Sequence, residues 1–315
     1  MLSIINITLP IFIMIALGYA AVRFDIINPV QITGLGRFVV VFAYPAVIFH
    51  AFASKPVTAL FVPSYMLAYG SATILLFIAT YLLTLKFKKN GGKHAALNAM
   101  GVTYSNSGFI GFPVLSLVVG QHDAAVFLAM NLFIENLISL LPMIVIAESH
   151  GQSKRALHLI WGAIKKLLQT PLIIAIFLGM FFSLAHIPLP TIANRVIDML
   201  MISAAPVGIF VIGGGLYGVK IRSNLKEAIW LTLAKLLALP LLVLAFFALI
   251  PNVPNEVLMS GFLMASTPMA TMYALISHQY GEGKDSSSNL LVCTMLSFFS
   301  LSAVLMIWQY LFPYH

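Results

Sequence analysis

The feature that most constrains this chain is a series of long apolar runs joined by short polar connections. A membrane span needs about 20 apolar residues, and ten stretches qualify: 4–23, 34–53, 65–86, 95–118, 124–147, 168–187, 196–217, 227–249, 257–278 and 289–311. Only 8% of the residues are charged and the mean hydropathy is +1.01, whereas soluble proteins carry about 25% charged residues. A soluble domain could not bury this much apolar surface. The predicted fold class is therefore an all-α polytopic membrane protein.

The basic residues gather on one side of the predicted spans. Connections after even-numbered spans carry only Lys55 and Arg195. Connections after odd-numbered spans carry fourteen: Arg23, Arg37, Lys86, Lys88, Lys89, Lys93, Lys154, Arg155, Lys165, Lys166, Lys220, Arg222, Lys226 and Lys284. This asymmetry predicts a protein of the cytoplasmic (inner) membrane with both termini outside the cytoplasm. Because the basic residues lie in short membrane-flanking loops, the net charge of +8 does not indicate a nucleic-acid partner.

An internal repeat divides the chain into halves. At an offset of 161 residues, "PIFIMIALG" (10–18) aligns with "PLIIAIFLG" (171–179) and "FAYPAVIF" (42–49) with "SAAPVGIF" (203–210), with nine of seventeen positions identical. Each half holds five predicted spans, and an odd number inverts the second half. The expected organisation is a five-helix repeat over 1–147, a cytoplasmic linker over 148–167 and an inverted five-helix repeat over 168–315, an arrangement common in secondary transporters.

Two of the predicted spans have polar interruptions at matching repeat positions. Gly101 aligns with Gly261 at an offset of 160, which brings "YSNSG" (104–108) close to "MASTP" (264–268). Broken backbone is tolerated at membrane depth only where protein or a wet cavity satisfies it. We expect Ser107 and Thr267 to cap new half-helices over 108–118 and 268–278, with both N-termini at the bilayer midplane. Two such ends would form an anion site; the alternative is that the small residues permit close helix packing.

Two ionisable residues lie inside predicted spans. Lys235 either binds an anionic substrate or exchanges a proton with it, or it extends its long stem toward the cytoplasm. Glu135 is either a protonatable coupling residue or a structural group, which would be part of an ion pair or a hydrogen-bonded neutral acid. Asn131, Glu135 and Ser139 recur every four residues and so share one helix face. Whether Glu135 and Lys235 lie together is left open by the sequence.

The chain resembles the auxin efflux carrier family, which includes bacterial carriers of malonate and related acids and belongs to a superfamily with the bile-acid sodium symporters. The resemblance covers nearly the whole chain. It is carried by "LPIFIMIALGY" (9–19), "FAYPAVIF" (42–49), "SNSGFIGFPVL" (105–115), "SAAPVGIFVIGGGLYG" (203–218), "LAKLLALPLL" (233–242) and "STPMATMYALIS" (266–277). It implies ten spans in two inverted repeats, a scaffold and a transport domain, and broken spans 4 and 9 that cross where a carboxylate binds.

The resemblance also implies site residues. Carried over by position, together with the polar residues found above, the expected substrate-binding set is Ser105, Asn106, Ser107, Gly108, Ser266, Thr267, Pro268 and Lys235. The coupling candidates are Glu135 and Asn131, and the hinge or crossover prolines are Pro113, Pro45 and Pro206. The second interrupted span has a proline at its break, whereas Pro113 lies five residues past Gly108. The linker of about twenty residues is much shorter than in plant members, which argues against auxin as the substrate.

The function predicted from the sequence is a secondary carrier of small carboxylates that works by alternating access within the lipid bilayer. The second hypothesis is a sodium-coupled symporter of the bile-acid type, and the third is a receptor or channel that does not transport by alternation. Nucleotide-binding, zinc and nucleophile motifs are absent from the sequence, so an enzyme is not expected and no cofactor or metal is predicted. Whether the coupling ion is H⁺ or Na⁺, and whether the carrier is a homodimer, is left open.

Overall fold

The computed structural model describes residues 2–54, 60–87, 91–148, 161–162, 165, 168–218 and 225–311, and within these residues it is all-helical. Six of the described helices are long and apolar enough to cross a membrane: Pro29–Ala53, Pro63–Lys86, Gln121–Glu148, Thr191–Leu216, Leu225–Ala248 and Asp285–Tyr310. They coincide with the predicted spans 2, 3, 5, 7, 8 and 10. The chain is therefore a multi-span membrane protein. The predicted linker, 148–167, lies almost entirely outside the described residues.

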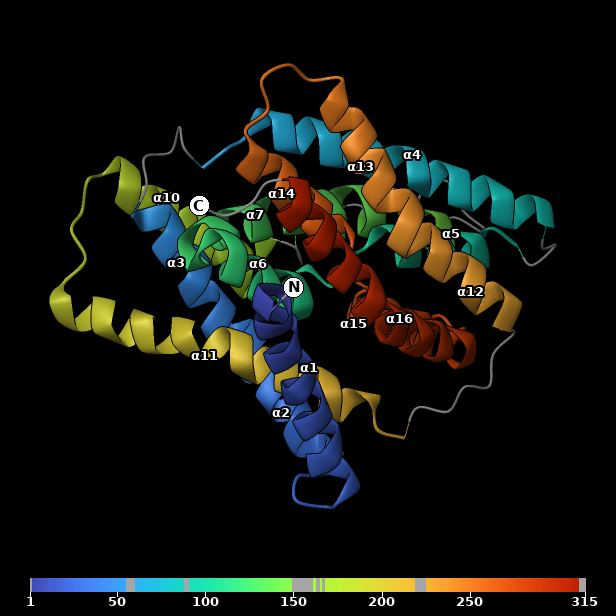
Figure 1. The fold of residues 1–315 in the computed structure, drawn as a ribbon, viewed down its shortest axis with the longest axis horizontal. Coiled ribbons are helices and arrows are strands. Elements are labelled where there is room, and N and C mark those ends of the chain that lie inside the picture. The colour runs from blue at the N-terminus through green and yellow to red at the C-terminus, as the bar shows by residue number, and fades with distance from the viewer. Residues whose placement is uncertain are drawn as a thin grey trace. The chain divides into compact units, whose positions relative to one another are not determined.

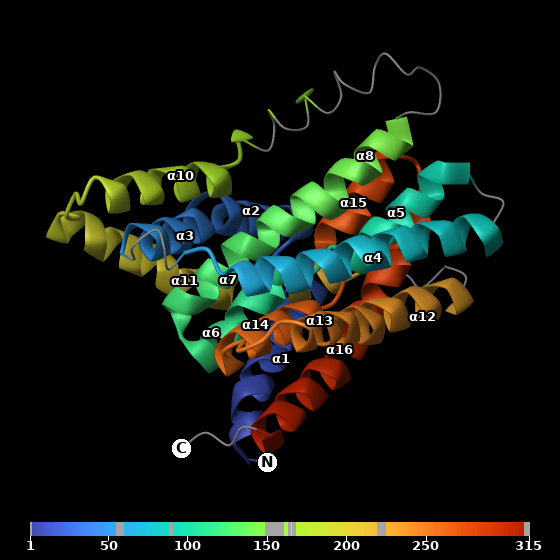
Figure 2. The same ribbon diagram turned by 90° about the horizontal axis from the view of Figure 1, so that it is seen from above.

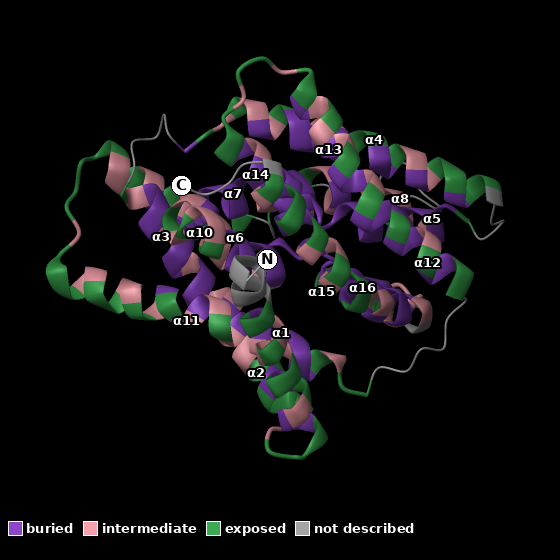
Figure 3. Ribbon diagram, in the orientation of Figure 1, coloured by how far each residue is buried: buried purple, intermediate pink, exposed green. Residues whose placement is uncertain are grey.

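The helices expose apolar side chains outward. Leu82, Phe181 and Ile202 are each more than half exposed, and Figure 3 marks exposed residues along the outer sides of α4 and α11. In a soluble protein such surfaces would be an aggregation hazard. In a bilayer they meet lipid, and helices suit that environment because every backbone group is satisfied within the segment.

The described chain forms two compact units, each of which takes segments from both halves of the sequence. Unit 1 comprises 1–62, 108–130 and 168–218. Its helices are α1 (Leu2–Arg23), α2 (Pro29–Phe38), the π-helical η1 (Val39–Ala43), α3 (Tyr44–Ala53), α6 (Phe112–Val119), most of α7 (Gln121–Ile134), α10 (Pro171–Leu184) and α11 (Thr191–Leu216). Within it α1 packs on α11 and α10 packs on α3 (Figure 1).

Two glycines of unit 1 make reciprocal contacts. A Cβ atom on Gly18 of α1 would lie 2.0 Å from the Phe210 carbonyl oxygen of α11, and one on Gly179 of α10 would lie 2.8 Å from the Phe49 carbonyl oxygen of α3. Gly18 aligns with Gly179, and Phe49 with Phe210, at the offset of 161 residues found in the sequence. The aligned positions therefore use the same backbone approach twice, once with each half supplying the glycine.

Unit 2 comprises 63–107, 131–167 and 219–315. Its described elements are α4 (Pro63–Phe87), α5 (Gly91–Thr103), the start of the π-helical η3 (Ser107–Gly111), the end of α7, η4 (Glu135–Leu140), α8 (Leu141–Glu148), α12 (Leu225–Leu233), η5 (Ala234–Ala238), α13 (Leu239–Ala248), α14 (Asn255–Ala265), α15 (Thr271–Gln279) and α16 (Gly283–Leu311). Figure 2 shows α4, α5 and α8 side by side.

Both predicted interruptions are present. The helix expected over 95–118 ends at Thr103 and resumes at Ser107, and the helix expected over 257–278 ends at Ala265 and resumes at Thr271. The chain passes from unit 2 to unit 1 directly after the first break, between Ser107 and Gly108. The second break lies wholly in unit 2.

The glycine contacts of unit 1 can be tested by adding one methyl group. Gly18→Ala should lower the free energy of unfolding by about 1–3 kcal/mol, because the new atom meets backbone that cannot rotate away. Gly34→Ala on α2 has nothing within 4 Å of the new Cβ, and it should stabilise the helix by about 0.5–1 kcal/mol. Thermal unfolding of the purified protein in detergent measures both changes. Equal effects of the two substitutions would contradict the packing described.

Candidate functional site: a buried lysine and glutamate at paired helix breaks

The two helix breaks of unit 2 pair with each other through their backbones. Ser105 and Met269 form an isolated antiparallel β-bridge. The Asn106 amide donates to the Pro268 carbonyl at 2.8 Å, and the Ala270 amide donates to the Tyr104 carbonyl at 3.0 Å. Each interrupted helix thus supplies the hydrogen bonds that the other has lost, as a break at membrane depth requires.

The hydroxyl groups at the second break close the preceding helix. Ser266 Oγ donates to the Phe262 carbonyl at 2.7 Å, and Thr267 Oγ1 donates to the Met264 carbonyl at 2.8 Å. The prediction that Thr267 caps the following half-helix is therefore wrong. Helix α15 begins only at Thr271, after Ala270, which makes no side-chain cap; the peptide groups between them are used for pairing with the first break.

Glu135 binds the first break from the start of η4. Its Oε1 atom accepts hydrogen bonds from the Ser105 amide at 3.0 Å, the Ser107 hydroxyl at 2.7 Å and the Asn131 side-chain amide at 3.0 Å. The side chain is fully buried, and among the described residues Oε2 has no hydrogen-bond partner. Asn131, Glu135 and Ser139 are all buried on one helix face, as their spacing predicted.

Lys235 approaches the same break from η5. It is fully buried, and its ammonium donates to Ser105 Oγ and, at 3.3 Å, to the Ala265 carbonyl at the end of α14. The alternative in which this lysine extends toward the cytoplasm is therefore wrong. The question that the sequence left open is also answered, because Glu135 and Lys235 bind the backbone and side chain of the same residue, Ser105.

Two tyrosines that the sequence analysis missed complete this cluster. Tyr65 and Tyr69 of α4 stack with centroids 5.6 Å apart and rings 9° from parallel. The Tyr69 hydroxyl lies 3.0 Å from Ser105 Oγ, and the Tyr65 hydroxyl donates to Asn131 Oδ1 at 2.8 Å. Their spacing of four residues inside an apolar span was a signal for a shared polar face.

A proline signal accompanies the π-helical turns that carry the site. Within the described residues, the segments η1, η3, η4 and η5 each end two residues before a proline, at Pro45, Pro113, Pro142 and Pro240. Proline lacks an amide and clashes with the carbonyl four residues earlier. A wider turn removes the clash: the Leu239 amide, for example, bonds the Ala234 carbonyl five residues back. Ser107, Glu135 and Lys235 lie in three of these segments, a common setting for functional residues.

The remaining predicted residues belong to unit 1. Gly108 packs on the ring of Tyr44, to which an added Cβ would come within 3.1 Å. Pro45 and Pro113 follow the π-helical segments η1 and η3, and Pro206 lies inside α11. The predicted set is thus divided: Ser105, Asn106, Ser107, Ser266, Thr267, Pro268, Lys235, Glu135 and Asn131 come together in unit 2. The hinge roles of the three prolines stay predictions.

Comparison with known proteins identifies the family of this chain. Residues 3–307 match the sequence family described as "Membrane transport protein". The chain belongs to this family. The family is one of transporters, not of enzymes, and the resemblance to auxin efflux carriers deduced from the sequence is confirmed.

Two relatives are similar to this chain over most of its length. A protein of Rhizobium meliloti (strain 1021) named "Putative malonate transporter" is 27% identical over 309 residues, which cover 97% of this chain and 96% of that protein. The "Lysosomal cholesterol signaling protein" of Mus musculus is 26% identical over 302 residues, which cover 89% of this chain and 34% of that protein. The family member described here spans about a third of the mouse protein.

Because Lys235 and Glu135 interact electrostatically, the changes in the free energy of unfolding caused by replacing each of them should not be additive. Lys235→Met removes the only ammonium bound to Ser105 in the described structure, and leaving a buried carboxylate without its counter-charge costs about 3–5 kcal/mol. Adding Glu135→Gln should recover part of this loss, because the double variant has no buried charge to balance. Unfolding by SDS in mixed micelles measures the cycle, with Lys86→Met at the exposed end of α4 as the control. Additive losses would contradict the link.

Proposed function

We propose that this chain is a secondary transporter of small organic anions, of the size and charge of malonate, in the cytoplasmic membrane. The observation that carries the proposal is a fully buried lysine at the point where two broken helices pair. A buried ammonium is costly, is seldom kept in a membrane span without a task, and favours an anion as its partner. The name of the Rhizobium relative supports a dicarboxylate such as malonate.

The substrate carboxylate would bind between Lys235 and the peptide groups of the two breaks. In unit 2, α15 begins at Thr271, two residues after Met269, which pairs with Ser105 of the first break. A helix N-terminus carries roughly half a positive charge and free donors. We assign Asn106, Ser266, Thr267 and Pro268 to this environment, and Gly108 to the corresponding end in unit 1.

The ten-span arrangement with two inverted repeats belongs to the same proposal. The reciprocal contacts of Gly18 with Phe210 and of Gly179 with Phe49 support it, because aligned residues of the two halves exchange roles. An inverted repeat built in this way would let the protein open to either side through one motion. Unit 1 would be the scaffold and unit 2 the moving transport domain, with the termini outside as the charge distribution predicts.

The contacts of Lys235 favour an anion carrier over a sodium symporter. The sodium alternative needs oxygen ligands near the breaks. Two of those oxygens, Ser105 Oγ and the Ala265 carbonyl, already accept from the lysine ammonium. A built-in cation at this point makes a bound sodium ion unnecessary there.

Transport by purified protein in proteoliposomes tests the substrate assignment. Uptake of labelled malonate should be saturable and unchanged when potassium replaces sodium. Asn106→Ala combined with Lys235→Met should abolish it, whereas Lys86→Met should leave it intact. Malonate should also raise the thermal unfolding temperature of the wild-type protein, because a ligand stabilises the state that binds it.

Two results would redirect the proposal. Full transport by the double variant would remove the assigned site. Stabilisation by a ligand without any uptake would favour a receptor, a class suggested by the signalling name of the mouse relative.

Glu135 is proposed as the proton-coupling residue of this site. Its Oε2 atom is buried without a partner among the described residues, and Oε1 connects it to both Ser105 and Ser107. Glu135→Gln keeps an acceptor oxygen at Oε1 but cannot exchange a proton. It should therefore weaken malonate accumulation driven by a pH gradient while leaving counterflow exchange at equal pH intact. Loss of both activities, or of neither, would exclude the coupling role.

A further inference from the structure

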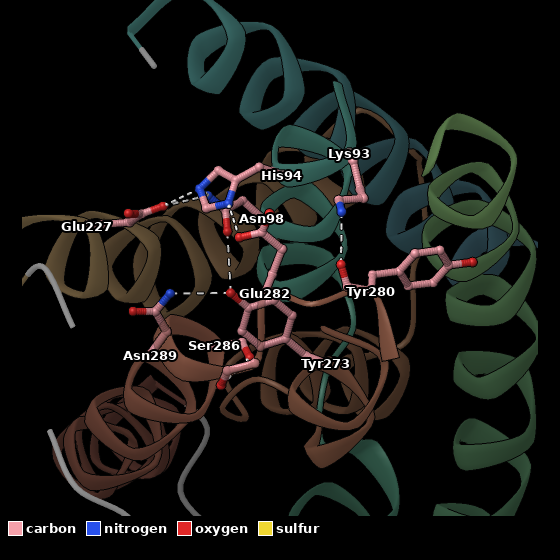
Figure 4. Close-up of polar contacts among 10 residues, drawn as sticks. Lys93, His94, Asn98, Glu227, Tyr273, Tyr280, Glu282, Ser286 and Asn289 are labelled. Carbon is pink, nitrogen blue, oxygen red and sulfur yellow. Dashed lines mark hydrogen bonds and ion pairs between the residues drawn. The ribbon is translucent and has the colours of Figure 1, made fainter. Parts of the chain in front are cut away.

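A second buried ionisable cluster lies in unit 2 near the start of α5. His94 of α5 contacts Glu227 of α12 through Nε2 and Oε1 at 2.8 Å, and Glu282 of the α15–α16 connection through Nδ1 and Oε2 at 3.3 Å (Figure 4). The side chains of His94 and Glu227 are only 7% and 3% exposed, while that of Glu282 is 32% exposed. One imidazole is thus held between two carboxylates, one of which reaches water.

Counting protons shows that this geometry requires an extra one. Each nitrogen-to-oxygen contact needs a proton, and a neutral imidazole has one N–H and one lone pair. With both ring nitrogens facing carboxylate oxygens, the three groups must hold two protons between them. The amide of Asn98 also lies 3.2 Å from Nε2, but its shorter contact, 2.8 Å, is to Glu227 Oε1. It therefore does not replace the proton between His94 and Glu227.

Losing the extra proton should break the contact with Glu282. Without that proton, a lone pair on one ring nitrogen faces a carboxylate oxygen, and the two repel. The contact with Glu227 is shorter, more buried and supported by Asn98. The contact with Glu282 is longer and its side chain is partly exposed, so the Glu282 carboxylate can turn toward water at lower cost. The α15–α16 connection would then be released from α5.

The cluster acts on the two half-helices that pair at the breaks. Tyr273 of α15 donates to Asn98 Oδ1 at 3.3 Å, and the Lys93 ammonium donates to the Tyr280 carbonyl at 2.9 Å. The residue after α5 and the residue before α15 are also joined, because the Ala270 amide donates to the Tyr104 carbonyl. His94 and Tyr104 are ten residues apart, about 15 Å along a helix. The cluster and the breaks thus hold α5 and α15 at two separate points.

Other charged groups near this cluster determine how it responds to pH. Glu148 accepts from the Tyr280 hydroxyl at 2.9 Å, and Asp285 stands in the first turn of α16. The titratable and charged groups on the elements around His94 include Lys86 of α4, Lys93 of α5, Glu148 of α8, Lys226 and Glu227 of α12, Tyr273 and His278 of α15, Tyr280 and Glu282 of the connection, and Asp285 of α16.

We propose that His94, Glu227 and Glu282 form a proton-binding site whose occupancy fastens the α15–α16 connection to α5. Proton loss frees the connection and, with it, the ends of α5 and α15 that lie away from the breaks at Ser105 and Met269. This role in the transport cycle rests on the proposed function. The proton site itself does not, because its occupancy is measurable without any substrate.

Hydrogen–deuterium exchange in the full-length protein tests the site directly. The reporter is the peptide containing the amides of Gly281 and Glu282, which donate to the His278 and Ser277 carbonyls. Its exchange is measured across about pH 5 to 8, the range in which imidazole ordinarily titrates. In wild type, the protection factor of this peptide should decrease by roughly tenfold or more as the pH is raised. This is the change expected when one charge-assisted hydrogen bond is lost.

Glu282→Gln is the decisive variant. A glutamine amide can donate to the lone pair of a neutral imidazole, so the contact no longer needs the extra proton. Protection in Glu282→Gln should stay high at alkaline pH, and comparison with wild type at each pH cancels the intrinsic pH dependence of exchange. His94→Gln should show low protection throughout. The same pH dependence in wild type and Glu282→Gln, or wild-type protection in His94→Gln, would overturn the proposal.

A transport measurement separates this proposal from the previous one. Glu282→Gln should retain thermal stabilisation by malonate but transport it more slowly than wild type at alkaline pH, because the connection cannot detach. If malonate neither binds nor is transported, the proposed function fails while the exchange result still decides the proton site. If malonate transport is normal in Glu282→Gln at every pH, the proton site at His94 has no part in the transport cycle, and its proposed link to transport is wrong.

Discussion

An interrupted helix inside lipid leaves peptide groups without partners, and the bonds that satisfy those groups at Ser105 bring several elements of unit 2 together. The Ser105 amide binds Glu135, its hydroxyl binds Lys235 and Tyr69, and its backbone bridges to Met269. Five elements, α4, the two breaks, η4 and η5, therefore depend on one residue. Burying two ionisable side chains is costly in isolation, but here each of them supplies bonds that the broken backbone would otherwise lack.

Proline makes this convergence possible at a distance from the breaks. A regular α-helix has 3.6 residues per turn. The wider turns before Pro142 and Pro240 therefore change the direction around the helix axis in which the preceding side chains point. Glu135 and Lys235 stand at the beginning of those turns. The orientation of each ionisable group thus depends on a proline that stands several residues later in the chain. The unit 1 segment before Pro45 follows the same rule and carries no ionisable residue, so the wide turn is a property of the proline and the charge is an addition.

Local pattern and long-range contact explain what sequence could and could not predict. The apolar runs, the two breaks and the polar face of Asn131 and Glu135 are visible within one span each, and all were predicted. Thr267 was misplaced because its hydroxyl binds backward to Met264, a choice that a cap pattern does not distinguish. The contacts of Tyr65 with Asn131, of Tyr69 with Ser105 and of His94 with Glu227 were missed because each joins separate segments of the chain. His94 and Glu227 are 133 residues apart. A single sequence carries no signal for such a pairing.

The partners of Lys235 have a consequence for molecular discrimination. Its ammonium is held by a hydroxyl and a peptide carbonyl, both of them uncharged dipoles. A ligand gains from contact with the lysine only if it offers more than these internal ligands do. A full negative charge does so, because it adds a charge–charge attraction to the hydrogen bond, and that attraction is stronger in an apolar interior than in water. An undissociated acid or an amide of the same shape would merely exchange one neutral contact for another. The contacts that Lys235 already makes therefore favour anions over neutral metabolites as its ligands.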